Sequence, residues 1–156
     1  MKKFIFATLL GLLIALFQTS FLNELFGVYL NPNWLLSIVF AFLMVNRFND
    51  ALYLSIVFGF ILDLFGVGPV GLSSFIFVCF VIVAKLFTTL VLKGITGLVI
   101  LIPIVTIFYR VLIFSAPLTL QTVMYGFINL AFVFFFAFFI RRLEGRYLSV
   151  VYRIRA

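Results

Sequence analysis

The feature that most constrains this chain is the length of its apolar runs, which very few charges interrupt. Residues 51–84 contain a single charged side chain, Asp63, and residues 94–140 contain only Arg110. A helix that crosses a bilayer needs about 20 mostly apolar residues. Each run is too long for one such helix and suits a hairpin of two.

Turn signals lie where these two hairpins should bend, at the glycine-rich segment 66–71 and at Ser-Ala-Pro 115–117. Polar residues divide the N-terminal part in the same way, at 23–33 and at 46–50. We therefore predict an all-α fold, a polytopic membrane protein whose six transmembrane helices form one bundle at roughly 4–22, 34–46, 50–65, 71–90, 95–114 and 119–140. The second helix is too short to span alone unless protein surrounds it or it extends into the polar flank, and a re-entrant segment is the alternative.

Composition supports this class and excludes several others. Apolar residues make up 67% of the chain and charged residues 10%, whereas soluble domains are about a quarter charged. The chain has no His and a single Cys, which excludes His/Cys zinc sites, Ser–His–Asp catalysis and an intrachain disulfide. We predict a protein that is no enzyme, has no metal or other cofactor, and lies in the lipid bilayer rather than on nucleic acid.

The basic residues predict an orientation. The chain has 11 Lys and Arg against 4 Asp and Glu, a net charge of +7. Under the six-helix count, ten of the eleven basic residues lie on one side: Lys2, Lys3, Arg47, Lys85, Lys93, Arg141, Arg142, Arg146, Arg153 and Arg155. The positive-inside rule then places both termini in the cytoplasm. Residues 1–140 form the membrane domain, and residues 141–156 are a basic cytoplasmic tail that can lie on an anionic leaflet.

Two ionisable residues fall inside predicted spans, where each is a candidate functional residue because burying a charge in lipid is costly. Asp63 and Arg110 lie at similar depths in the outer half of the bilayer, from helices that run in the same direction. We expect a structural ion pair between them. The functional alternative is a proton or ion relay.

Small and polar residues recur at helical spacing on three helices. Such stripes allow close backbone approach and interhelical hydrogen bonds in lipid, so we expect them to hold the bundle together. They comprise Thr8, Gly11, Ala15 and Gln18; Ser55, Gly59, Asp63 and Gly66; and Thr96, Pro103, Thr106 and Arg110.

The segment 59–72, Gly-Phe-Ile-Leu-Asp-Leu-Phe-Gly-Val-Gly-Pro-Val-Gly-Leu, resembles the central signature of the MreD family of rod shape-determining membrane proteins. That signature is a Gly, a few apolar residues, Leu-Asp, a short Gly-containing turn, and Gly-Leu opening the next helix. Gln18-Thr19-Ser20 at the end of the first helix and Pro32 before the second also fit. Asn33 departs from the family pattern, which often has Asp there. The candidate residues are Gln18, Gly59, Asp63, Gly66, Gly68, Pro69, Gly71 and Arg110.

The resemblance implies a non-enzymatic component of the elongation machinery in the bacterial inner membrane, which helps direct lateral peptidoglycan synthesis and cell shape. It also implies a set of partners: MreC, the actin-like MreB, the RodA glycosyltransferase and a class B penicillin-binding transpeptidase. The family is considered similar in fold to substrate-binding subunits of ECF-type vitamin transporters, and membership of that class is the alternative function.

We expect the protein to work by holding a partner. The short second helix should leave an incompletely covered flank. The single membrane anchor of an MreC-like protein could shield that flank.

Overall fold

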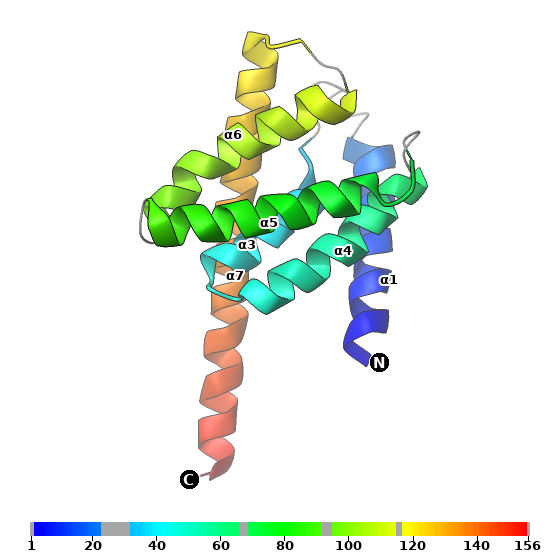
Figure 1. The fold of residues 1–156 in the computed structure, drawn as a ribbon. Coiled ribbons are helices and arrows are strands. Elements are labelled where there is room, and N and C mark those ends of the chain that lie inside the picture. The colour runs from blue at the N-terminus through cyan, green and yellow to red at the C-terminus, as the bar shows by residue number, and fades with distance from the viewer. Residues whose placement is uncertain (1, 23–31, 66–68, 92–94, 115–116, 156) are drawn as a thin grey trace.

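The structure, a computed structural model, describes residues 2–22, 32–65, 69–91, 95–114 and 117–155 (Figure 1). Within these ranges the chain forms six α-helices and no strand, which confirms the predicted all-α class. The helical elements are α1 (Lys2–Phe17), its π-helical continuation η1 (Gln18–Leu22), α3 (Trp34–Met44), α4 (Phe48–Phe65), α5 (Leu72–Leu90), α6 (Ile95–Phe114) and α7 (Leu120–Arg155). Their order and bounds follow the apolar runs of the sequence closely.

Three of these helices are long and apolar enough to cross a membrane: α4, α5 and the part of α7 from Leu120 to Leu143. The other three contain shorter apolar stretches. Large apolar side chains also cover the outside of the molecule, and Phe75 and Leu90 are examples, exposed by 68% and 79%. Many exposed apolar side chains of this size are typical of a protein whose solvent is lipid.

The short helix α3 is the centre of the bundle. Nine of its eleven residues are buried, and Leu35, Val39 and Phe40 are completely enclosed. At 1.5 Å of rise per residue, a helix of this length covers only about half of a hydrocarbon core of ~30 Å. Helices α1, α4, α5, α6 and α7 all contact it. The expectation of an uncovered flank on this helix was wrong, because the chain's own helices enclose it.

Asparagines define both ends of α3. The side chain of Asn33 accepts the N–H of Leu36 at 3.1 Å and caps the first turn. Asn46 adopts a φ of 62° just after the helix, a left-handed conformation that Asn tolerates better than most residues. Arg47, directly before α4, then forms an ion pair of 2.6 Å with Asp50 in the first turn of that helix. The connection between α3 and α4 is therefore short and well defined.

Helices α4 and α5 form the most extensive helix pair, and Gly59 allows their close approach. A Cβ atom at Gly59 would lie 2.3 Å from the Cα of Ser74. Gly11 plays the same part between α1 and α4, where a Cβ would lie 2.6 Å from Ile61. The small-residue stripes predicted on the first and third helices are thus packing faces.

The last helix is longer than predicted. α7 runs for 36 residues and projects beyond the body of the bundle toward the C-terminus (Figure 1). The segment 141–155, expected as a basic tail, continues this helix to Arg155. The segment contains five arginines, which are good helix formers, and no proline, so the helix continues through Gly145. The ends of the chain marked N and C lie at the same end of the molecule (Figure 1).

Candidate functional site

Asp63, near the end of α4, caps the start of α5. Its carboxylate accepts the N–H of Gly71 at 2.7 Å and the N–H of Ser73 at 3.1 Å. The first N–H groups of a helix have no partner inside the helix and carry partial positive charge. A carboxylate placed there satisfies them and gains from the helix dipole. Asp63 is only 7% exposed, so this cap is buried.

The turn before α5 depends on Gly71. This residue has a φ of 97°, a region that L side chains rarely adopt and glycine enters freely. Its left-handed conformation directs both its own N–H and that of Ser73 toward Asp63. The carbonyl of Pro69 accepts the N–H of Leu72 at 3.2 Å and closes the turn. Of the predicted candidates, Gly66 and Gly68 lie outside the described residues.

The expected ion pair between Asp63 and Arg110 does not form. The Asp63 carboxylate is occupied by backbone N–H groups, as described above. The guanidinium of Arg110 lies over the ring of Tyr125 on α7, 4.4 Å from its centroid. Both residues are buried. A helix terminus thus balances the acidic group, and an aromatic face lies against the basic one.

Tyr109 links these two groups. Its hydroxyl lies 3.5 Å from the Ser73 hydroxyl, at the limit of a hydrogen bond, and Ser73 is itself held by Asp63. Tyr109 precedes Arg110 on α6 and packs its ring against Phe77 of α5. The capped start of α5, the last third of α6 and the aromatic side of α7 therefore meet in one buried polar region.

A second group of polar contacts joins α3 to α7. The side-chain carbonyl of Asn129 accepts the N–H of Asn33 at 2.9 Å and the Ser37 hydroxyl at 3.2 Å. Its amide donates to the carbonyl of Tyr125 at 2.8 Å. Asn129 and Ser37 are completely buried. Two of these hydrogen bonds fix the central helix against α7 in an apolar surrounding, and the third, within α7, orients the Asn129 side chain.

Gln18, directly after α1, also makes a hydrogen bond to the start of α3. Its side-chain oxygen accepts the N–H of Trp34, the first residue of α3, at 3.2 Å. That N–H would otherwise be one of the unsatisfied donors of a helix start. The Trp34 ring lies between Phe17 of α1 and Phe132 of α7. Gln18 therefore connects the first helix to the central one.

Sequence reasoning identified Asp63, Gly59, Gly71 and Gln18 but missed the residues of α7. Asn129 and Tyr125 lie in a long apolar run and were not among the predicted candidates. An amide in such a run nevertheless indicates an interhelical hydrogen bond. Gly126 was missed as well. A Cβ there would lie 3.0 Å from Ile107 and 3.1 Å from the Pro103 carbonyl of α6.

Comparison with known proteins identifies no relative of this chain. A scan against protein-family models and searches of curated proteins and of solved structures found no match to the chain. Interpretation of the site therefore rests on its own geometry. That geometry consists of buried polar groups whose hydrogen bonds join α4 to α5 and α3 to α7, and of a cation–ring contact that joins α6 to α7.

Proposed function

We propose that this protein is a non-enzymatic, multi-pass component of the bacterial rod-shape elongation machinery. One observation supports this proposal: the residues of the MreD-like segment determine how two helices of this chain pack. Gly59 lets α4 and α5 touch, Asp63 caps α5, and Gly71 supplies the required left-handed turn. A signature whose residues set bundle geometry suits a protein that acts by presenting a surface.

The proposed direct partner is an MreC-like protein, which binds through its single membrane anchor. MreB, RodA and a class B penicillin-binding transpeptidase are further members of the same proposed assembly. Since α3 is enclosed, the anchor must pack outside the six helices. We place it on α1, which packs mainly on α4. Leu9, Leu13 and Leu16 form one exposed face of α1 at helical spacing, and each is more than half exposed.

Photo-crosslinking tests this placement. A photoreactive residue in place of Leu13 should capture the partner's membrane anchor. The same residue in place of Ile104, on the exposed side of α6 and 57% accessible, should not. Capture from Ile104 alone would move the partner to α6, and capture of no rod-shape protein from either position would contradict the proposed function.

We also propose that the protein lies in the inner membrane with both termini in the cytoplasm. The two ends of the chain lie at the same end of the molecule (Figure 1), and the basic residues are concentrated on that side of the six-helix topology. In a Cys79→Ser background, a cysteine at Val70 should react with an impermeant thiol reagent from outside. A cysteine at Asn46 should react only after the membrane is permeabilised. The reverse pattern would invert the topology.

The alternative function is a substrate-binding subunit of an ECF-type vitamin transporter. The buried polar region of Asp63, Tyr109 and Arg110 favours it, because such residues could also contact a small polar ligand. Copurification distinguishes the two functions. A rod-shape component retains an MreC-like protein, whereas a transporter subunit retains paired ATPases.

A further inference from the structure

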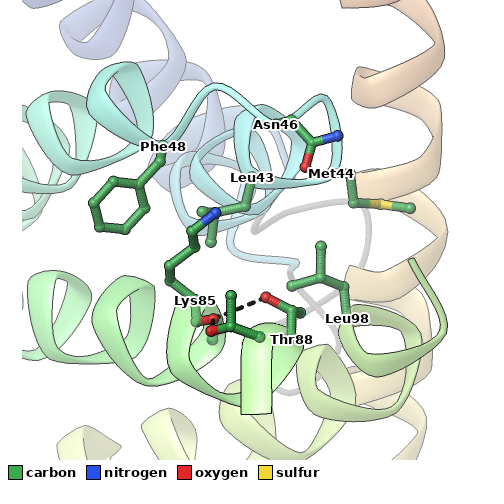
Figure 2. Close-up of a pocket in the computed structure, with 9 residues that line it drawn as sticks. Leu43, Met44, Asn46, Phe48, Lys85, Thr88 and Leu98 are labelled. Carbon is green, nitrogen blue, oxygen red and sulfur yellow. Dashed lines mark hydrogen bonds between the residues drawn. The ribbon is translucent and has the colours of Figure 1, made fainter. Parts of the chain in front are cut away.

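A cavity of about 140 Å³ opens at the turn between α3 and α4, against the last turns of α5 and the start of α6 (Figure 2). It lies away from the Asp63 and Asn129 contacts. Its floor is apolar and includes the buried side chains of Leu43 and Leu98. Its polar groups are Asn46, Lys85, Thr88 and Thr89. A cavity with an apolar floor and a few polar groups is the usual form of a small-ligand site.

Lys85 supplies the charge of this cavity. Its side chain rises from α5 toward the α3–α4 turn, and its ammonium lies 5.8 Å from the ring centroid of Phe48 (Figure 2). Among the described residues the only ion pair joins Arg47 to Asp50, so no carboxylate there balances Lys85. The cavity thus combines a cation with an enclosing apolar wall, which favours an anion as its occupant.

The remaining polar groups specify more than charge. The side-chain amide of Asn46 makes no hydrogen bond to the described residues and can donate to an oxygen anion, whereas its backbone N–H donates to the Leu43 carbonyl. The hydroxyls of Thr88 and Thr89 donate to the Lys85 carbonyl, at 3.0 and 2.6 Å. Their oxygens are therefore left as acceptors, which suit a ligand hydroxyl. Donors for an anion and acceptors for hydroxyls together match a glycerophosphate group.

The surroundings indicate a lipid as the source of that group. The α5 surface beside the cavity is apolar and exposed, at Leu86, Leu90 and Val91, and the floor can accommodate the first methylenes of an acyl chain. In the proposed topology, this end of the bundle faces the cytoplasmic leaflet, where basic pockets between helices recognise anionic headgroups. We infer that the cavity binds the headgroup of phosphatidylglycerol or a related anionic glycerophospholipid, with Lys85 on the phosphate.

Native mass spectrometry of the full chain tests this inference, after exchange into mixed phosphatidylglycerol and phosphatidylcholine. One phosphatidylglycerol should remain bound in preference to phosphatidylcholine. Lys85→Gln should weaken its retention about fivefold, the equivalent of ~1 kcal/mol for one lysine at the membrane surface. Asn46→Gly, which preserves the positive φ but removes the amide, should weaken it as well. Both residues are exposed, so neither change should unfold the protein.

Arg142→Gln is the matched control, because Arg142 is an exposed basic residue outside the cavity. It should change retention less than twofold. An equal loss in Arg142→Gln and Lys85→Gln would show diffuse charge attraction and overturn the site. Equal retention of phosphatidylcholine would also overturn it. If soluble glycerol 3-phosphate displaces the lipid completely at millimolar concentration, a free phosphate ester is the ligand and the lipid source is wrong.

Discussion

The N–H of Gly71 donates a 2.7 Å hydrogen bond to the carboxylate of Asp63, and this bond ties the end of α4 to the start of α5. The two residues lie eight positions apart in the sequence, and the chain reverses direction between the helices that they join. The carboxylate comes from one helix and caps the next, so two transmembrane segments share one buried charge. The left-handed backbone of the glycine and the charge of the aspartate are needed together.

Asp63→Asn should lower the free energy of unfolding by about 1–2 kcal/mol, because a neutral amide keeps one acceptor but loses the interaction with the α5 dipole. Asp63→Ala should cost more. Asp50→Asn is the control, since it removes a partly exposed carboxylate in the first turn of α4, where solvent screens both its ion pair and the helix dipole. Thermal unfolding in detergent measures all three. Adding Arg110→Gln to Asp63→Asn should not recover the lost stability. A recovery would show that Asp63 and Arg110 do form an ion pair, in contradiction to the structure.

Gly71→Ala should destabilise the protein by about 1–2 kcal/mol through its positive φ alone, because the space around its Cβ position is open. Gly71→Asn should recover part of that loss, since Asn tolerates the left-handed region. If the two variants are equally destabilised, steric crowding rather than backbone conformation explains why position 71 requires glycine. The yield of monodisperse protein and the melting temperature measure the relative stabilities of the wild type and the two variants.

Gly59→Ala and Gly126→Ala should differ. At Gly59 the new Cβ would meet the backbone of Ser74 at 2.3 and 2.4 Å, and backbone cannot move without separating α4 from α5. At Gly126 it would meet the end of the Ile107 side chain at 3.0 Å and the Pro103 carbonyl at 3.1 Å, contacts that a small shift can relieve. We expect loss of folded protein for Gly59→Ala and about 1–3 kcal/mol for Gly126→Ala. Equal effects would contradict the close approach at Gly59.

Tyr125→Phe should retain the interaction with Arg110, because the ring face is preserved, whereas Tyr125→Leu should lose it. A desolvated cation–π contact at 4.4 Å is worth about 2 kcal/mol. Since Leu also changes the packing, a double-mutant cycle with Arg110→Met isolates the pair. A coupling energy near zero would mean that the ring does not stabilise the guanidinium.

The sequence by itself determined the six apolar helices of the described residues and where nearly all of them begin and end. Charges and turn residues punctuate the apolar runs, and a bilayer requires each run to satisfy its backbone within a helix. It also determined that Gly59, Asp63 and Gly71 belong together, because they lie on one short hairpin.

Only the tertiary structure decided which groups meet across distant segments. Asp63 and Arg110 lie 47 positions apart in the sequence, and equal depth could not reveal that a helix start and an aromatic ring are their actual neighbours. Asn33 caps the start of α3 and Asn129 lies in α7, and sequence spacing carries no information on such a contact. The same reason applies to α3. Its brevity predicted an exposed flank, but burial depends on how five other helices cross it, and packing angles are fixed by the shapes of all the side chains at once.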